Sequence, residues 1–253
     1  MQFTAPYALI GDSTNLSLHL HADHLLDLRA SGLTDETIRA AGAYSIRPRD
    51  FALFFSARKG VPPTIETALC FPYQGGEFAR IKLFPALKTM KYSQPPKTSA
   101  RLYVPFKVNN GPLYVCEGEK KTLAAIQAGM NAVGIGGLWS WLTKGEPIDD
   151  LKLIDWDGRE VTIIPDSDVF NRVDLLRAVY ALGRELQSLG GSVYVAEIPQ
   201  SDCGKVGLDD YLLAGGEVGG LDLFRVDHQK FKGLQYWHRE WKFKKAVSSL
   251  MAA

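Results

Sequence analysis

The feature that most constrains the fold is a pair of short apolar runs that each end in carboxylates. Leu113-Tyr-Val-Cys leads directly into Glu117, and Val161-Thr-Ile-Ile-Pro leads directly into Asp166 and Asp168. An apolar run of this length that stops at charged residues is typical of a buried parallel strand. In open α/β sheets, ligands collect at the carboxyl ends of such strands. The sequence therefore predicts an α/β fold with a site where these two strands end.

Three carboxylates at this edge make a set of hard oxygen ligands. Asp166 and Asp168 are two residues apart, so an extended backbone directs both side chains the same way, and Glu117 joins them if the strands are neighbours. Such a set suits Mg2+ or Mn2+. Because no basic partner is evident, we expect the carboxylates to repel one another, so that Asp166→Asn leaves the stability of the metal-free protein equal or slightly higher. The alternative is that these side chains merely cap helices and line a solvated sheet edge.

Two lysines follow the first carboxylate at the start of a predicted helix. Lys120 and Lys121 come directly after Glu117-Gly-Glu119, where either would neutralise a nucleotide phosphate. The alternative is a solvent-exposed lysine pair, the commoner fate of such residues. Glu119 is the nearest candidate for a base that activates water. The predicted catalytic residues are thus Glu117, Asp166, Asp168, Lys120 and Lys121.

Two of these motifs resemble a known family. Cys116-Glu-Gly-Glu and Pro165-Asp-Ser-Asp resemble the signature motifs of the Toprim domain, which occurs in bacterial-type primases, topoisomerases and several nucleases. Each motif alone is short and common, but here both end predicted strands with a βα unit between them. The resemblance implies a Toprim-like core, with a central parallel sheet flanked by helices. It also implies that Glu117, Asp166 and Asp168 bind Mg2+ (or Mn2+).

A third motif follows the predicted core. Lys205-Val-Gly-Leu-Asp-Asp resembles the Lys-Asp-Pro-Asp element that trails the core in primases. Leu208 stands where those enzymes usually keep an acid or a proline. The resemblance implies that Asp209 adds a carboxylate to the metal site. The alternative is that Asp209 caps the next helix.

The segment 78–107 contains no Asp or Glu, although the whole chain has a formal net charge of only +1. Its cations are interleaved with aromatic side chains. Lysines track phosphates and aromatic rings stack on bases, so this pattern predicts a surface for single-stranded nucleic acid. The alternative is a solvated strand-rich module with its aromatic residues in the core. The residues predicted to bind are Arg80, Lys82, Lys88, Lys91, Tyr92, Lys97 and Arg101.

The same segment resembles the basic subdomain that precedes Toprim in bacterial-type primases. The matching elements, in the same order, are Phe71-Pro-Tyr, a Gly-Gly turn, Arg80, Lys91-Tyr-Ser-Gln-Pro and Leu102-Tyr. In those enzymes the corresponding lysine and tyrosine lie in the template groove. This sequence lacks their upstream zinc-binding module and their downstream helicase-binding domain, so a replicative helicase would be a separate polypeptide. Over roughly residues 25–216, the chain is similar to a Toprim-like family of unknown function found in phage and plasmid replication proteins.

Four segments divide the chain. With 253 residues it fits one large domain or two small ones. We predict an N-terminal helical segment (1–50), a smaller basic α+β subdomain (51–110), the Toprim-like core (111–216) and a cationic, aromatic helical tail (217–253). The tail is either a helix that packs back on the sheet or an arm for nucleic acid or a partner protein.

Composition and motifs argue against several classes. Cys70, Cys116 and Cys203 are scattered, which argues against a disulfide framework or a zinc ribbon and for a reducing compartment. The sequence shows no secretory leader and no apolar stretch of 18 residues, so we expect a cytoplasmic protein without a membrane partner. It contains no Gly-x-x-x-x-Gly-Lys-Ser/Thr motif, which argues against an ATPase of that class.

The sequence thus favours metal-dependent phosphoryl transfer on nucleic acid. The preferred hypothesis is a DNA primase-like nucleotidyltransferase that makes RNA primers from ribonucleotides on a single-stranded DNA template, in phage or plasmid replication. A second hypothesis is a Toprim nuclease, which would use the same acids with water as the nucleophile. A third is a non-catalytic module that binds single-stranded nucleic acid and keeps a vestigial metal site.

Overall fold

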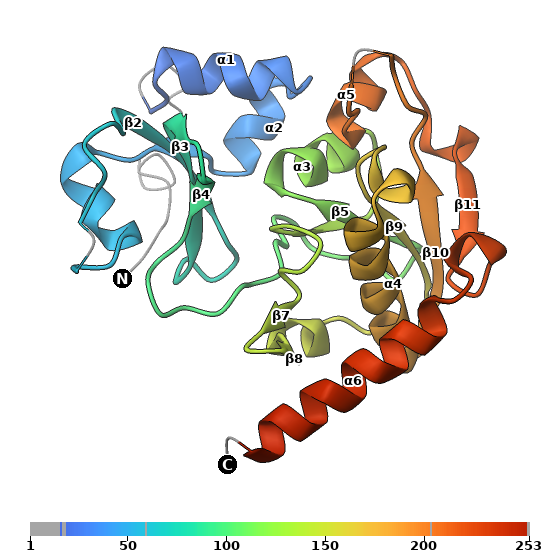
Figure 1. Cartoon of the computed structure of the whole chain (residues 1–253). Helices are drawn as coiled ribbons and strands as arrows, with labels where there is room; N and C mark the ends of the chain where they lie inside the picture. The colour runs from blue at the N-terminus through green and yellow to red at the C-terminus, as the bar shows by residue number, and fades with distance from the viewer. Residues whose placement is uncertain (1–15, 17–18, 59, 203, 252–253) are drawn as a thin grey trace. The chain divides into compact units, whose positions relative to one another are not determined.

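The chain forms two compact units (Figure 1). One comprises Met1–Ser99 and Tyr103–Lys107, and the other comprises Ala100–Leu102 and Val108–Ala253. The computed structural model describes residues 16, 19–58, 60–202 and 204–251, the last five by their backbone alone. The predicted segments 1–50 and 51–110 fall largely in the first unit, and the segments 111–216 and 217–253 fall in the second. No helix within these described ranges is long and apolar enough to span a membrane.

An antiparallel sheet of four strands, in the order β1-β2-β3-β4, forms the centre of the first unit. The strands are β1 (Tyr44–Ser45), β2 (Thr67–Pro72), β3 (Ala79–Leu87) and β4 (Met90–Ser93), and the helices are α1 (Ala22–Ala30), α2 (Asp35–Ala40) and the 3-10 helix η3 (Pro48–Phe54). The Gly-Gly turn that the resemblance includes joins β2 to β3 as a hairpin. Gly75 and Gly76 have φ angles of 84° and 71°, a region that glycine enters at little steric cost.

Strand β3 alternates between two environments, as expected where one face of a sheet packs on a core. Ile81 and Leu83 are buried in a cluster that also contains residues of η3. Arg80 and Lys82 alternate with them and are only partly buried. The two predicted nucleic-acid ligands on this strand therefore share one face of the sheet.

A sheet of five strands, in the order β11-β10-β9-β5-β6, forms the centre of the second unit. Four strands are parallel, and the edge strand β11 runs antiparallel to β10. The strands are β5 (Leu113–Glu117), β6 (Ala132–Ile135), β9 (Glu160–Ile164), β10 (Ser192–Glu197) and β11 (Asp222–Arg225), with a small separate hairpin of β7 (Leu142–Thr143) and β8 (Glu146–Pro147). The α-helices are α3 (Glu119–Gln127), α4 (Val173–Ser188), α5 (Leu208–Leu213) and α6 (Leu234–Met251), and the 3-10 helices are η4 (Asp149–Leu153), η5 (Val169–Asn171), η6 (Val218–Gly220) and η7 (Gln229–Phe231). This mostly parallel sheet flanked by helices confirms the predicted fold class.

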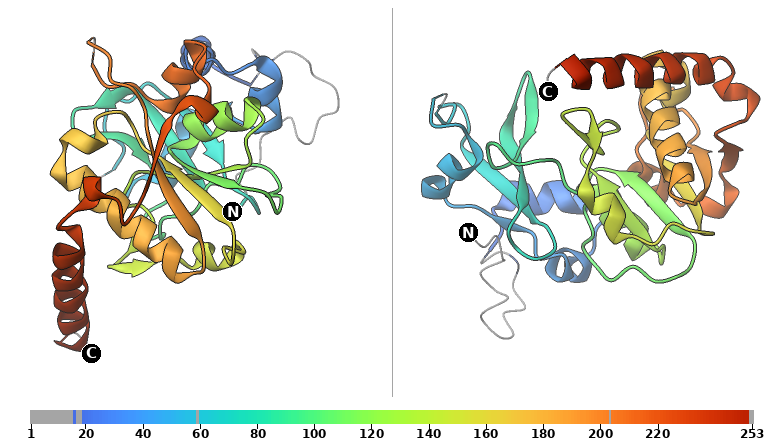
Figure 2. Two further views of the ribbon diagram at one scale, coloured as in Figure 1. Left: turned by 90° about the vertical axis from the view of Figure 1, so that its right-hand side faces the viewer. Right: turned by 90° about the horizontal axis from the view of Figure 1, so that it is seen from below.

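Helices cover both faces of this sheet (Figure 2). Helices α3 and α5 pack on the face that carries Cys116 and Ile164. Helix α4 packs on the opposite face, where Ile163 lies. A Cβ atom at Gly183 of α4 would lie 3.7 Å from Ile163 Cδ1 and only 2.4 Å from Val226 Cγ1. Gly183 therefore allows α4 to approach the chain closely at this point.

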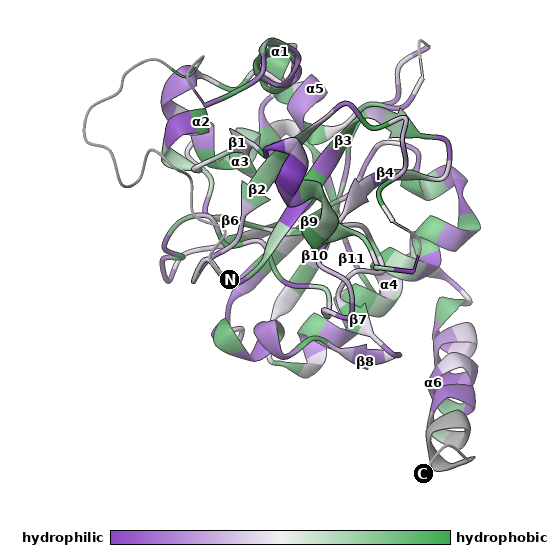
Figure 3. Cartoon of the chain, turned by 90° about the vertical axis from the view of Figure 1, so that its left-hand side faces the viewer, coloured by the Kyte–Doolittle hydropathy of each residue, from purple (hydrophilic) through white to green (hydrophobic). Residues whose placement is uncertain are grey.

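The predicted helical tail forms α6, which packs back on the second unit through α4 and Trp139. The rings of Trp237 and Trp241 stack with their centroids 5.9 Å apart, and the Trp139 ring lies 5.8 Å from that of Trp241. Lys245 Nζ also lies 3.2 Å from a carboxylate oxygen of Glu146. Hydrophilic and hydrophobic residues alternate along the helix (Figure 3). Helix α6 thus contacts α4, Trp139 and Glu146, and its role as an arm for nucleic acid or a partner protein stays a prediction.

Candidate functional site

Two neighbouring parallel strands bring the predicted carboxylates to one edge of the sheet. Strands β5 and β9 pair with Cys116 opposite Ile164. Glu117 ends β5, and Asp166 and Asp168 follow shortly after the end of β9. Because parallel strands end at the same edge, the three carboxylates lie at the carboxyl edge of the sheet. From the sequence, Glu117 was expected to join the two aspartates if their strands are neighbours. Strands β5 and β9 are neighbours.

Gly118 turns the chain from β5 into α3. Its backbone has φ of 94° and ψ of 161°, a region that essentially glycine alone occupies. A Cβ atom there would have open space, so the backbone conformation and not crowding requires glycine. The amide of Gly118 donates to the Ile135 carbonyl over 2.7 Å, and its carbonyl accepts from the Thr122 hydroxyl over 2.8 Å. These bonds fix the turn that carries Glu117.

Asp166 lies between two lysines, contrary to the expectation that the carboxylates lack basic partners. The Asp166 side chain is only 4% exposed; Lys121 Nζ donates to its Oδ1 and Lys205 Nζ donates to its Oδ2. The premise of uncompensated repulsion is therefore wrong. Asp166→Asn is now expected to lower stability, because it leaves two ammonium groups without their anion.

Lys205 is the site residue that sequence reasoning missed. It opens the segment that resembles the Lys-Asp-Pro-Asp element, in which only the acids were considered. Ser167 holds this segment in place: its amide donates to the Val206 carbonyl over 3.0 Å, and its Oγ accepts from the Val206 amide over 2.9 Å. Gln200 Nε2 also donates to the Ser167 carbonyl over 3.1 Å. The turn that carries Asp166 and the loop that carries Lys205 are thus tied together by hydrogen bonds.

The charges at this edge influence one another. Burial raises the pKa of Glu117, the nearby Asp166 raises it further, and the ammonium groups of Lys121 and Lys205 oppose this rise. Burial alone would lower the pKa of Lys205, but the hydrogen bond to Asp166 and its charge outweigh burial, so the pKa is raised. Lys205 therefore remains an ammonium ion at neutral pH. Glu117 is deprotonated less readily than an exposed glutamate.

Asp168 has an unsatisfied oxygen. Its Oδ1 is buried and has no hydrogen-bond partner among the residues that the structure describes, while its Oδ2 lies 3.5 Å from Arg172 Nη1. A buried carboxylate oxygen without a donor is costly unless a ligand or an ion supplies the missing partner. Among the three carboxylates, Asp168 therefore has an oxygen, Oδ1, that could accept a bond from a ligand or an ion.

Asp209 borders the site. It is 7% exposed in the first turn of α5. A Cβ atom at Gly207 would lie 2.6 Å from Asp209 Oδ1 and 2.7 Å from Lys121 Cε. The side chains of Asp209 and Lys121 therefore both lie against Gly207. Asp209 does not cap α5: the N-cap is Gly207, and its amide donates to Asp210 Oδ2 over 2.9 Å.

Three further predicted groups lie at the start of α3. Lys121 reaches Asp166, as described above, and Lys120 is half buried one position earlier. Glu119, the candidate base for water, is 1% exposed. Solvent therefore has little access to this carboxyl group.

The donor set fits a divalent cation in its chemistry. A hard cation would satisfy the buried Asp168 Oδ1 and would offset the repulsion by Asp166 that adds to the effect of burial on the pKa of Glu117. Within the described part of the chain, however, no three or more His, Cys, Asp or Glu side chains are grouped so that they could hold a metal ion. Both oxygens of Asp166 face lysines instead. Binding of a cation through Asp166 therefore requires that a lysine leave it.

The predicted nucleic-acid residues of the first unit fall into two groups. Lys82 is engaged with α1, where its Nζ lies 2.5 Å from Asp27 Oδ1 and both side chains are largely buried. The Arg80 guanidinium lies over the Tyr92 ring, 4.9 Å from its centroid. The exposed members are Lys88, Lys91 and Lys97. The exposed lysines are the ones accessible to a phosphate.

Arg101 belongs to the second unit. Its Nη1 donates to Asp150 Oδ1 over 2.8 Å, and Asp150 Oδ2 accepts from the Leu102 amide over 2.9 Å. The segment 78–107 contains no acid of its own, but Asp27 and Asp150 from other elements neutralise part of its positive charge. Lys82 and Arg101 are held in ion pairs, which weakens their assignment as nucleic-acid ligands.

The family comparison gives a match without a function. Residues 105–218, less than half of the chain, match the family described as "Domain of unknown function (DUF3854)". No curated protein matches the sequence.

Two solved structures of primases share this fold. The crystal structure of the Aquifex aeolicus primase (zinc binding and RNA polymerase domains) matches with a TM-score of 0.59 at 15% sequence identity, over 81% of this chain and 57% of that one. The structure of the DnaG catalytic core matches with a TM-score of 0.51 at 17% identity, over 80% of this chain and 73% of that one. This chain thus spans little more than half of the Aquifex structure. The likeness shows a fold similar to that of primase cores.

Proposed function

We propose that this protein is a metal-dependent, DNA primase-like nucleotidyltransferase of the Toprim type, which makes RNA primers on single-stranded DNA in phage or plasmid replication. The observation that carries the proposal is the sheet edge where Glu117, Asp166 and Asp168 lie with Lys121 and Lys205. Carboxylates together with ammonium groups suit a ribonucleoside triphosphate and its cation, since the acids bind the cation and the lysines bind phosphate oxygens. The similarity to primase folds supports this choice of chemistry.

The carboxylates and the lysines of the site have different proposed roles. When bound, Mg2+ (or Mn2+) supplies stabilisation of the charge on the transferred phosphoryl group. Glu117, Asp166 and Asp168 would hold it. Lys121 and Lys205 bind the phosphate oxygens of the incoming ribonucleotide once they leave Asp166. Because the pKa of Lys205 is raised, it stabilises negative charge and does not accept the proton of the attacking hydroxyl.

The first unit is proposed to hold the template strand. Lys88, Lys91 and Lys97 are exposed cations for phosphates, and Arg80 with Tyr92 offers a guanidinium beside an aromatic ring. We further propose that a separate replicative helicase delivers the single strand.

The test is a template-directed assay with labelled ribonucleotides, single-stranded DNA and Mg2+ or Mn2+, beside a cleavage assay on the same strand. The unmodified protein should make short RNA oligomers, and Asp166→Asn should make at least about 100-fold less. The matched control is Asp149→Asn, an exposed carboxylate paired with Lys152, which should be as active as the unmodified protein. Shortening of the template without synthesis would favour a nuclease. Binding of the strand without either reaction would leave a binding module, and both results overturn the proposal.

A further inference from the structure

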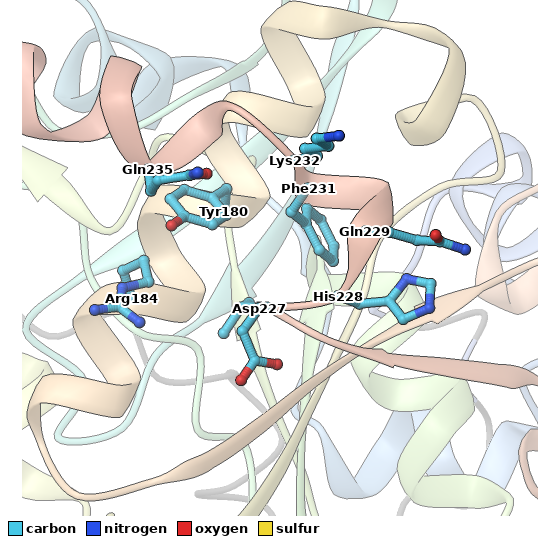
Figure 4. A pocket seen from close by; sticks show the side chains of 9 residues that line it. Tyr180, Arg184, Asp227, His228, Gln229, Phe231, Lys232 and Gln235 are labelled. Carbon is cyan, nitrogen blue, oxygen red and sulfur yellow. The ribbon is translucent and has the colours of Figure 1, made fainter.

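A hollow of about 390 Å3 opens between the C-terminal half of α4 and the segment that follows β11 (Figure 4). A second hollow of about 360 Å3 adjoins it along α6. Because the two share Tyr180, Arg184 and Gln235, they form one continuous depression, which we call the α4–α6 groove. Its charged rim is formed by Arg184, Lys232, Arg239 and Lys242.

The α4–α6 groove lies apart from the carboxylate site. Strand β11 runs antiparallel to β10, with Asp222 opposite Glu197 and Arg225 opposite Tyr194. The end of β11 therefore points away from the carboxyl edge of the sheet, and the segment after Arg225 starts near the amino edge. None of the proposed catalytic residues lines the groove.

Cations outnumber acids around the groove. The side chains of Lys232 and Arg239 make no hydrogen bond or ion pair with any residue that the structure describes, and Arg184 Nη1 donates to the neutral amide of Gln187. Asp227, which lines the groove, and Glu185, which lies beside Lys242, are already engaged. Asp227 Oδ1 lies 3.4 Å from Arg225 Nε, and Glu185 lies 3.8 Å from Lys242 Nζ. The groove therefore presents a net positive charge with unused donors.

A buried polar atom adjoins this charge. His238 lines the second hollow and is 9% exposed, and its Nε2 has no hydrogen-bond partner in the part of the chain that is described. Burial lowers the pKa of His238 to about 4, and the positive charges of Lys242 and Arg184 contribute to this decrease. The imidazole is therefore neutral at pH 7. A buried nitrogen without a partner indicates a missing ligand atom or water.

We propose that the α4–α6 groove binds a phosphate-bearing anion, at a site separate from the carboxylates. The guanidinium groups of Arg184 and Arg239 match pairs of phosphate oxygens, and Lys232 and Lys242 add point charges. Because Nε2 of His238 is covered by its surroundings here, the hydrogen bond that it donates to the same anion, in the tautomer protonated on Nε2, forms when the imidazole shifts toward the groove. The phosphate is carried either by a free nucleotide or pyrophosphate or by a nucleic-acid backbone, and the two sources differ in the experiment below.

The test titrates the full chain by calorimetry in the presence of a chelator, with inorganic pyrophosphate, ATP and a short single-stranded DNA as probes. Arg184→Gln and Arg239→Gln should each weaken binding of the phosphate probe at least about tenfold, since each removes a bidentate contact. Both side chains are exposed, so the variants should fold normally. The matched control is Arg49→Gln, which removes an exposed arginine of the first unit. The loss of a DNA signal but not of a pyrophosphate signal would assign the site to a nucleic-acid backbone, and the reverse would assign it to a free anion.

Two further measurements separate this site from the proposed active site. Binding should persist in Lys205→Met, which removes one of the lysines proposed to bind phosphate at the carboxylate site, whether or not the protein makes primers. His238 should show a change of its Nε2 nitrogen resonance on binding, while His24, held between Ser45 and Thr67 in the first unit, should not. The proposal is overturned if none of the probes binds, if the arginine variants bind as Arg49→Gln does, or if His238 is unchanged at saturation.

Discussion

Asp166 illustrates how single residues balance charge in this protein. A carboxylate that is 4% exposed is tolerated because Lys121 and Lys205 each donate to one of its oxygens. The two lysines differ in freedom, since the Lys205 side chain is 54% exposed and that of Lys121 is 19% exposed. Lys205 is thus the more readily displaced when a cation arrives.

Lys205→Met should therefore bind Mg2+ or Mn2+ about tenfold more tightly, a factor that corresponds to ~1.4 kcal/mol. The change keeps the aliphatic stem but removes the charge that competes with the cation for Asp166. Calorimetry on the metal-free protein measures the affinity without reference to activity. Lys152→Met, which removes an exposed lysine paired with Asp149, should leave the affinity as it is. Equal or weaker metal binding in Lys205→Met would show that Lys205 does not occupy the place of the cation.

The site was predictable from the sequence only where local pattern determines it. Glu117, Asp166 and Asp168 follow from two apolar runs and from the rule that parallel strands end at one edge. Lys205 is 39 residues from Asp166 and is placed by the hydrogen bonds of Ser167, which no short-range pattern encodes. For that reason the carboxylates were expected to lack basic partners.

At the scale of elements, the β3–β4 region contains no acid in its own sequence, but an acid from another element lies against it in the fold. Lys82 pairs with Asp27 of α1, an element more than 50 residues away in the chain. The exposed lysines at the end of β3 and in β4, Lys88 and Lys91, have no such partner among the described residues. Binding of a strand should therefore depend on these two and much less on Lys82.

The double change Lys88→Ala with Lys91→Ala should reduce the slope of log affinity against log salt by about 0.7 for each phosphate that the variant no longer binds. Fluorescence anisotropy of a labelled single-stranded DNA at several salt concentrations measures this slope. Lys152→Ala, in the second unit, serves as the control for removal of an exposed cation. An unchanged slope in the double variant would mean that this region is a solvated strand-rich module and not the template surface.

The elements that the sequence predicted poorly are those without an apolar signature. The parallel strands β5 and β9 are apolar runs, and the parallel sheet was predicted from them. Strand β11 is mostly exposed and falls within the predicted helical tail. It joins the sheet through backbone pairing with β10, which its side chains do not indicate. The direction in which α6 packs depends on Trp139, far away in the sequence.

For the whole molecule, each unit buries one neutral histidine, and both make the fold sensitive to acid. Burial lowers the pKa of His24 to about 4, and the same holds for His238. In the unfolded chain these side chains titrate near the ordinary histidine pKa of 6.5. Between these values the unfolded state binds more protons than the folded state, so the free energy of unfolding falls as the pH is lowered from 6.5 towards 4. Above 6.5 the two groups add no pH dependence.

His24 should account for roughly 3 kcal/mol of this decrease, because each unit of pKa corresponds to about 1.4 kcal/mol. Urea unfolding at a series of pH values between 4 and 7 measures the effect. His24→Gln should flatten the dependence, although it lowers stability at pH 7 through imperfect bonds to Ser45 and Thr67. His228→Gln should keep the dependence of the unmodified protein. The same steep fall in His24→Gln would contradict the assignment.

The path of the chain between the two units has a consequence for dividing the protein. The chain enters the second unit at Ala100–Leu102, returns to the first for Tyr103–Lys107, and enters the second again at Val108. A fragment that begins at Val108 therefore lacks both hydrogen-bond donors of Asp150, which is 8% exposed. An unpaired carboxylate in that position is costly. A fragment that contains the whole second unit has to begin at Ala100, and it then carries Tyr103–Lys107 of the first unit with it.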